Sequence, residues 1–584
     1  MSPTQQKLAA IPAPENSASR AWLRALEMTA MIDAAPDRIF PAVIEELGAR
    51  FGDAPALLSP DENFRHAGLA GRSNQYARWA LGEGIAKGDT VCLLMPNRAE
   101  YLAIWLGLSR VGVVVALINT HLRGEGLAHC ITIAAPKHII VDTRLDAALE
   151  GLETDAIVWR HGAGFSERIS AMPNGTLTEG EWRPVTLADP ALLIYTSGTT
   201  GLPKAAFVSH RRVMMWTHWF AGMMDAGRHD RLYNCLPMYH SVGGVVASGA
   251  VLLAGGAVIL REKFSASAFW DDVAQSGATI FQYIGELCRY LLKSDIAPAP
   301  NSLRLICGNG LTADVWQAFQ DRFHIPQVLE FYAATEGNFS LYNMEGKVGA
   351  VGRVPGFLKH RFGVALVKLG PDGEPLRGPD GFCRRVAGGS PGEAIGRIGS
   401  GGARFEGYND PVATAKKILR NVFESGDAYV RSGDLMRQDA AGFYYFVDRL
   451  GDTFRWKGEN VATTEVAAAL AAYPGVAAAT VYGVVVPGHD GKAGMAALET
   501  DENFALSGLR AHLAARLPPY ARPLFLRLVP ALAVTETFKH KKQQLAIEGF
   551  DPARARNLYA ESGETYVPLD AALYARINSG LMRF

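Results

Sequence analysis

The stretch that decides the fold and the chemistry of this chain reads Leu193-Ile194-Tyr195-Thr196-Ser197-Gly198-Thr199-Thr200-Gly201-Leu202-Pro203-Lys204. It opens as a buried strand would and continues as a run of hydroxyls and glycines that ends at a lysine. Glycines let backbone N–H groups approach a ligand closely, and hydroxyls add further donors. Such a row of donors suits a phosphate, to which Lys204 would add a point charge. The spacing is not that of a Walker loop, and a flexible surface loop is the alternative reading of the same composition.

Length and composition exclude several classes of protein. The chain has 584 residues, so two or more domains are expected, and its 48% apolar and 20% charged residues are typical of a folded globular protein. The formal net charge is zero, which gives no global reason to expect a nucleic-acid partner. The six cysteines show no Cys-x-x-Cys spacing, so neither a zinc site nor a disulfide framework is indicated. A reducing, cytoplasmic setting is the expectation.

Helical and strand-like stretches alternate along the chain, which predicts an α/β architecture. Residues 1–35 contain Pro, Ser and Ala and are expected to form a loosely ordered lead-in. Helices are predicted over 74–81 and 103–108, and strands over 91–95 and 113–118.

Two apolar stretches have the length of a membrane span. Residues 101–119 are interrupted by Arg110. Residues 242–260 carry no charge but contain two pairs of glycines, which favours a helix, a turn and a buried strand over 257–260. A folded core is therefore predicted for both stretches.

The order of residues in 195–204 resembles the phosphate loop of the adenylate-forming enzymes, which comprise acyl-CoA synthetases, luciferases and the adenylation domains of peptide synthetases. Blocks at 116–123, 446–461 and 535–542 resemble one subgroup, the very-long-chain acyl-CoA synthetases or fatty acid transport proteins. The resemblance runs from about Phe40 to the C-terminus. The chain departs from the family pattern at Ala333 and Glu536, where glycine is usual.

The resemblance implies an α/β fold in two parts. A large N-terminal domain with mixed sheets and helices, residues 36–450, would bind ATP and the acyl substrate. A small, mobile C-terminal α+β domain, residues 451–584, would act as a lid and swing about a hinge at 448–452.

The resemblance also assigns the nucleotide site. Tyr332 would pack on adenine, Thr335 would bind the α-phosphate, and Glu336 would hold Mg²⁺, which prefers one carboxylate with substrate phosphates and waters. The implied ATP- and CoA-contacting set is Tyr195, Thr196, Ser197, Gly198, Thr199, Thr200, Gly201, Lys204, Gly308, Asn309, Gly310, Tyr332, Thr335, Asp434, Arg449 and Gly458. Within it, Asp434 would accept the ribose hydroxyls, as an acceptor-only carboxylate can, and the Gly458 loop would let coenzyme A pass.

Lys539 corresponds to the catalytic lysine of the family, acting with Lys204, Thr335 and Glu336. The acyl pocket is expected downstream of the Pro-Met-Tyr-His sequence that ends at His240. It would be lined by His240, Val242, Gly243 and Val245. A basic surface run at 539–542 and a core histidine at 240 are the plainer alternatives.

These residues predict a long- or very-long-chain fatty acid–CoA ligase that uses ATP, Mg²⁺ and coenzyme A. Attack of the carboxylate on the α-phosphate would give acyl-AMP and pyrophosphate, and the thiol of coenzyme A would then displace AMP. Peripheral contact with the inner face of the membrane is expected. The alternatives are a membrane-bound fatty acid carrier, acyl delivery to a carrier protein, and a ligase for another acid such as a bile acid or an aromatic acid.

Overall fold

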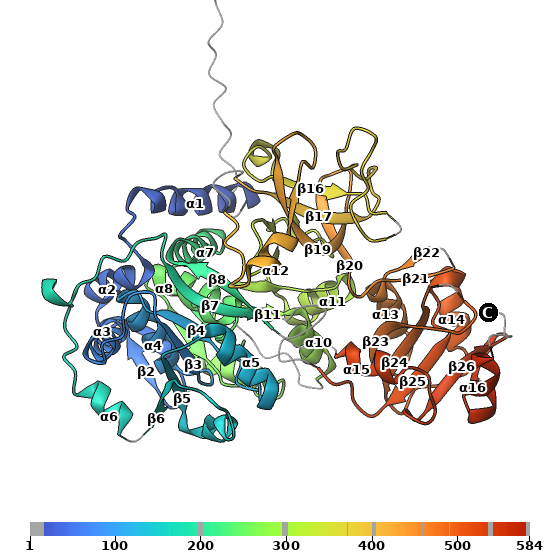
Figure 1. Ribbon diagram of the computed structural model, residues 1–584, viewed down its shortest axis with the longest axis horizontal. Helices are drawn as coiled ribbons and strands as arrows, with labels where there is room; N and C mark the ends of the chain where they lie inside the picture. Colours follow the sequence, from blue (N-terminus) through green and yellow to red (C-terminus); the bar gives the residue numbers. More distant parts are fainter. Residues whose placement is uncertain are drawn as a thin grey trace, which may run out of the picture. The chain divides into compact units, whose positions relative to one another are not determined.

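The computed structural model describes residues 17–162, 164–196, 203–294, 302–370, 372–399, 404–457, 459–489, 491–534 and 541–579 (Figure 1). The chain divides into two compact units, one of Met1–Gly363 with Ile398–Ile418 and the other of Val364–Arg397 with Leu419–Phe584. The α/β class, with a large N-terminal part and a smaller C-terminal part, is confirmed. The second unit begins at Val364, before the domain boundary predicted at residue 450. The hinge at 448–452 stays a prediction.

The first unit contains a six-stranded sheet in the order β6-β5-β3-β4-β7-β8. Adjacent strands of this sheet are parallel, except for β7 and β8, which are antiparallel and flank the glycine-rich loop in the sequence. Its strands are β3 (Thr90–Leu94), β4 (Val114–Leu117), β5 (His138–Asp142), β6 (Ile157–His161), β7 (Pro190–Thr196) and β8 (Lys204–Ser209). The central strands are apolar and buried on both faces, as parallel strands covered by helices are. The strands predicted over 91–95 and 113–118 are confirmed.

The second sheet of this unit runs in the order β15-β14-β13-β12-β11-β9-β10-β1-β2. The strands from β1 to β13 in this order are parallel, so their carboxyl ends meet at one edge, where α/β proteins place their ligands. The strands are β1 (Pro55–Leu58), β2 (Asn63–Arg65), β9 (Arg231–Asn234), β10 (Ala257–Leu260), β11 (Ile280–Ile284), β12 (Leu305–Asn309), β13 (Val328–Ala333), β14 (Ser340–Asn343) and β15 (Gly352–Arg353).

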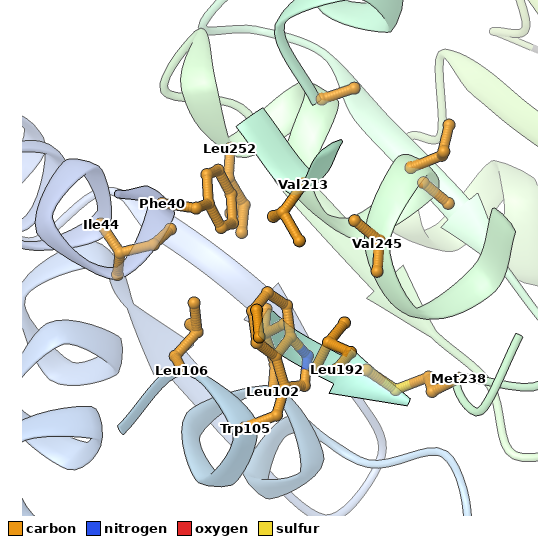
Figure 2. Close-up of a cluster of buried hydrophobic side chains, with 14 of the residues drawn as sticks. Phe40, Ile44, Leu102, Trp105, Leu106, Leu192, Val213, Met238, Val245 and Leu252 are labelled. Carbon is orange, nitrogen blue, oxygen red and sulfur yellow. The ribbon is translucent and has the colours of Figure 1, made fainter. Parts of the chain in front are cut away.

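Helices cover both sheets of the first unit, and Figure 2 shows the apolar cluster that four of them share with β7. The rings of Phe40 and Trp105 stack at 6.2 Å, Leu252 lies beside Phe40, and Val245 belongs to the same cluster. The helices of the unit are α1 (Ala18–Ala30), α2 (Phe40–Phe51), α3 (His66–Gly82), α4 (Ala99–Arg110), α5 (Gly124–Ala134), α6 (Phe165–Ser170), α7 (His210–Met223), α8 (Ala247–Leu253), α9 (Phe269–Ser276), α10 (Gly285–Lys293), α11 (Ala313–Phe323) and α12 (Pro411–Lys416).

The prediction of a loose lead-in over residues 1–35 is wrong for its second half. Helix α1 starts at a Ser17 cap whose hydroxyl accepts from the N–H of Arg20. Its Trp22 is 2% exposed and packs edge-on against Trp219 at 5.6 Å and Tyr342 at 5.5 Å. The burial of this large aromatic surface offsets the entropy lost in ordering the segment.

The two apolar stretches of span length fold into the first unit as predicted. Residues 101–119 belong to α4 and β4. Residues 242–260 form the π-helical turn η4 (Val242–Val246), then α8, a turn at Gly255 and the buried strand β10. In the part of the chain that the structure describes, no helix combines the length and the apolar character needed to cross a membrane.

The second unit holds one antiparallel sheet in the order β16-β17-β19-β20 and a five-stranded sheet in the order β23-β24-β25-β26-β27. Helix α14 begins directly after Gly508, which has a left-handed φ of 94°. The strands are β16 (Val364–Val367), β17 (Gly392–Arg397), β19 (Ala428–Gln438), β20 (Phe443–Arg449), β21 (Phe454–Trp456), β22 (Glu459–Val461), β23 (Val476–Val484), β24 (Ala493–Thr500), β25 (Phe525–Val529), β26 (Leu558–Ser562) and β27 (Thr565–Pro568), with β18 (Ile418–Arg420) at the junction of the units. The helices are α13 (Thr463–Ala471), α14 (Leu509–Ala514), α15 (Lys542–Glu548) and α16 (Ala571–Asn578).

Candidate active site

The two ends of the glycine-rich loop are fixed by β7 and β8. Thr196 and Lys204 lie opposite each other in this antiparallel pair. The buried hydroxyl of Tyr195 donates to the carbonyl of Cys130 at 2.7 Å, and burial raises the pKa of Tyr195 well above its usual value. Tyr195 therefore anchors the start of the loop, and its contact with a nucleotide stays a prediction. Ser197, Gly198, Thr199, Thr200 and Gly201 lie outside the described residues.

Thr335 and Glu336 follow strand β13 in the turn that leads to β14. The hydroxyls of Thr335 and Ser241 share a hydrogen bond of 3.1 Å, and Arg212 donates to the carbonyl of Thr335 at 2.6 Å. The hydroxyl of Tyr408 donates to Oε1 of Glu336 at 2.9 Å. The turn is therefore held from three other segments of the chain.

Lys204 lies close to this turn through a shared neighbour. Its Nζ lies 5.6 Å from the centre of the Tyr408 ring, within the range of a cation–π contact. Since the hydroxyl of the same tyrosine binds Glu336, the structure brings Lys204, Thr335 and Glu336 into one neighbourhood, as their predicted work on a triphosphate requires.

The residues that hold this neighbourhood together were not singled out from the sequence as part of the site. Residues 404–409 run along β8: Ala206 pairs with Tyr408, and the N–H of Asn409 donates to the carbonyl of Ala205 at 3.0 Å. Glu406, in the same segment, accepts from the backbone N–H and the hydroxyl of Ser209 at 2.8 and 2.6 Å. No local pattern reveals these contacts, because the partners are some two hundred residues apart.

Arg212 carries a signal that the sequence does contain. It follows Arg211 in a short basic pair, but its side chain is 8% exposed and also donates to the carbonyl of Arg404 at 3.1 Å. Its Nε lies 3.6 Å from the carboxylate of Glu406. Position 212 lies on the buried side of helix α7, among apolar residues such as Val213 and Met214. A charged residue at such a position indicates that a polar or charged group is buried beside it.

The predicted adenine segment, Gly308, Asn309 and Gly310, ends β12 beside β13. A Cβ on Gly308 would lie 2.2 Å from the carbonyl oxygen of Tyr283, and Gly310 has a left-handed φ of 80°, so both positions favour glycine. Tyr332, half-buried on β13, stacks on Phe339 at 5.6 Å. Both predicted adenine contacts therefore lie at the carboxyl ends of adjacent parallel strands.

A buried carboxylate that the sequence analysis did not single out fixes this turn. Oε1 of Glu330 accepts from the N–H of Gly310 at 2.7 Å and of Leu311 at 3.2 Å, and Oε2 accepts from the hydroxyl of Tyr283. Burial raises the pKa of Glu330 from 4.5 to about 8 despite these donors.

The donor set around Glu336 fits Mg²⁺. Lys417 lies 3.8 Å from the same Oε1 that Tyr408 binds, and no described residue hydrogen-bonds to Oε2. Within the described ranges, no group of three or more His, Cys, Asp or Glu side chains could hold a metal. A single carboxylate with one open oxygen is what Mg²⁺ uses when phosphates and waters complete its shell.

The predicted acyl-pocket residues lie together in and just before η4. His240 and Val242 are half-buried, whereas Val245 is 1% exposed inside the cluster of Figure 2. The carbonyl of Gly243 accepts from Asn234 and Ser248 at 2.9 Å each. These residues form one turn, and its contact with an acyl chain stays a prediction.

In the second unit, Asp434 and Arg449 face each other across β19 and β20, with Nε and Oδ1 3.6 Å apart. Asp448 beside them is buried, which raises its pKa, and accepts from the backbone N–H groups of Arg449 and Thr463. The pair thus presents an acceptor and a donor at one place, as a ribose site needs. Gly458 and Lys539 lie outside the described residues.

Comparisons with known proteins place the chain in a family. The family described as AMP-binding enzyme matches residues 44–376, and the AMP-binding enzyme C-terminal domain matches residues 465–539. Long-chain fatty acid transport protein 1 of Mus musculus is 41% identical over 92% of this chain and 87% of its own length. Long-chain fatty acid transport protein 2 of Rattus norvegicus is 39% identical over 93% and 91%.

The fold is that of a solved structure. The crystal structure of ATP-bound MatB from Rhodopseudomonas palustris superposes with a TM-score of 0.74, at 23% identity, over 87% of this chain and 98% of its own. The family match over residues 44–376 and the 41% identity to a relative over 92% of the chain lead to one conclusion: the chain belongs to the AMP-binding enzyme family and, within it, to the long-chain fatty acid transport proteins.

Proposed function

We propose that the chain is an AMP-forming ligase that joins long- or very-long-chain fatty acids to coenzyme A. The observation that carries the proposal is the convergence of Lys204 and Glu336 on Tyr408, beside the Thr335 turn. An ammonium and a metal-binding carboxylate at one place suit a triphosphate. The names of the relatives support a long acyl chain as the other substrate.

In the first half-reaction the fatty acid carboxylate attacks the α-phosphate of ATP and pyrophosphate leaves. The carboxylate is already ionised at neutral pH, so the step needs no general base. What it needs is positive charge and alignment, because the carboxylate and the triphosphate repel each other. Lys204 and Lys539 would supply fixed charge, Thr335 would donate to the α-phosphate, and Glu336 would hold the metal. Bound Mg²⁺ supplies charge neutralisation on the phosphate oxygens.

In the second half-reaction the thiol of coenzyme A attacks the acyl carbonyl and AMP leaves. Rotation about a hinge at 448–452 would move Lys539 away from the site and bring the Gly458 loop to it. Asp434 and Arg449 hold the ribose through both steps.

The proposal is tested by the release of AMP from ATP with coenzyme A and a series of acids from octanoate to lignocerate. We expect the ratio kcat/KM to rise with chain length, since each buried methylene gains about 0.8 kcal/mol. A bile acid and benzoate serve as controls for other carboxylates. AMP release that required benzoate or a bile acid, and not a fatty acid, would overturn the assigned substrate.

A second candidate is fatty acid uptake, which the names of the relatives favour. We propose that the chain contributes to uptake by trapping the acid as its thioester, from a peripheral position on the cytoplasmic face. Leu23, Met28 and Met31, on α1 or just after it, are 48%, 37% and 71% exposed and suit contact with a bilayer surface. The test is sedimentation with lipid vesicles before and after replacement of Leu23 and Met31 by Glu. Uptake that persisted in a Lys539→Ala variant would separate transport from ligation.

A further inference from the structure

One tyrosine links two groups that the proposed function assigns to ATP. Tyr408 is 7% exposed, its hydroxyl donates to Oε1 of Glu336 at 2.9 Å, and its ring lies 5.6 Å from Nζ of Lys204. Tyr408 belongs to neither the glycine-rich loop nor the Thr335–Glu336 turn. It is therefore a third element between them.

Tyr408 is held firmly enough to orient its neighbours. Its backbone pairs with Ala206 on β8, and its N–H donates to the hydroxyl of Thr414 at 2.9 Å. The hydroxyl of Thr414 in turn donates to the carbonyl of Asp410 at 2.9 Å. Burial raises the pKa of Tyr408, so its hydroxyl keeps its proton and remains a donor to the carboxylate.

We propose that Tyr408 is a positioning residue for Mg²⁺ and ATP: its hydroxyl turns the Glu336 carboxylate so that Oε2 faces the metal, and its ring supports the ammonium of Lys204. The inference rests on the proposed function, because it assumes that Glu336 and Lys204 bind the metal and the phosphates.

Tyr408 would orient the carboxylate with its hydroxyl and the ammonium with its ring, and these two contacts have different chemistry. A carboxylate can rotate about its last torsion, and a hydrogen bond to one oxygen fixes which oxygen points away. A lysine ammonium on its flexible four-carbon stem gains a preferred direction from an aromatic face. Removing the hydroxyl therefore disturbs its hydrogen bonds with Glu336 and Thr196, whereas removing the ring also disturbs the lysine.

The experiment measures ATP binding to the full chain by calorimetry, once in EDTA and once with saturating Mg²⁺, so that no turnover is required. Tyr408→Phe should bind ATP in EDTA within about twofold of wild type but lose about tenfold of the gain that Mg²⁺ brings, the worth of one hydrogen bond to a charged group. Tyr408→Leu should also weaken binding in EDTA. Tyr445→Phe, which removes a hydroxyl that donates to Asp439 at 2.9 Å, is the matched control and should bind as wild type does.

A double-mutant cycle tells positioning from a general effect on packing. If Tyr408 acts through Glu336, then Tyr408→Phe in a Glu336→Gln background should cause no further loss of the Mg²⁺ effect. Wild-type Mg²⁺ dependence in Tyr408→Phe, or losses that simply add in the double variant, would overturn the assigned role. A wild-type chain that bound no nucleotide would instead overturn the proposed function and this role with it.

Discussion

Oε1 of Glu330 lies 2.7 Å from the backbone nitrogen of Gly310, so a fully buried carboxylate holds the turn on which the adenine is expected to rest. The same group accepts from the hydroxyl of Tyr283 on β11, which lies two strands away in the sheet. A carboxylate placed here makes the geometry of the turn depend on the protonation state of one side chain.

Glu330 should give the chain a pH-dependent stability. Its pKa is raised to about 8 in the folded state, so the unfolded chain loses this proton near pH 4.5 while the folded chain keeps it. The stability from this group is present below pH 4.5 and is lost as the pH rises toward 8. Relative to Glu330→Gln, the free energy of unfolding of wild type should fall by roughly 1.4 kcal/mol per pH unit in this window. Urea unfolding at several pH values measures it, and a difference that stayed flat from pH 5 to 8 would contradict the raised pKa.

Gly244 should tolerate no side chain. A Cβ there would lie 1.9 Å from the carbonyl oxygen of Met238, so Gly244→Ala must shift the π-helical turn that contains Val242 and follows His240. We expect a loss of about 1–3 kcal/mol in stability and weaker use of fatty acid. Gly82→Ala is the matched control, because it adds the same methyl group to helix α3 where nothing lies within 4 Å. Equal behaviour of the two variants in thermal unfolding would count against the crowding at Gly244.

Lys539→Ala should separate the half-reactions. Loss of one aimed charge is expected to slow adenylation about a hundredfold or more, while thioester formation from supplied acyl-AMP continues. Pyrophosphate release and acyl-CoA formation are measured separately. Gly458→Leu is expected to do the reverse, and an equal fall of both half-reactions in either variant would remove its assigned role.

The acyl pocket is best probed at the edge of η4. Val245 packs inside the core, so Val245→Trp should chiefly lower stability, whereas Val242 is half-buried and a larger side chain there can enter a pocket. Val242→Trp should shorten the preferred acyl chain and leave ATP affinity nearly intact. Activity with palmitate and octanoate measures this, and a proportional fall of both would place the channel elsewhere.

The sequence predicts the fold well where the signal is local. The strands at 91–95 and 113–118 and the helix, turn and strand within 242–260 are visible as apolar runs punctuated by glycine, and the structure confirms them. The sequence analysis does not predict helix α1, because its alanines and serines are typical of a linker. The spacing of Ala21, Trp22, Ala25 and Thr29 on one face was the signal that could have revealed it.

The site is predictable only in part, because its supporting residues come from distant segments. Lys204, Thr335 and Glu336 are visible as motifs, and the structure brings them together. Tyr408 contacts Lys204 and Glu336, and Glu330 holds the turn at Gly310. Both contacts depend on strand pairing and burial in the complete fold and leave no mark in the neighbouring sequence.

The route of the chain also sets the order in which the site is made. The first unit is interrupted after Gly363 and resumes only at Ile398, so no single cut can release it whole. Glu336 leaves the ribosome 72 residues ahead of Tyr408. At usual elongation rates the carboxylate therefore waits roughly 4 to 14 seconds for its hydroxyl partner. Until residue 408 is made, β8 lacks the segment that pairs with it at Ala206, and an unpaired strand edge is a place where other strands can pair.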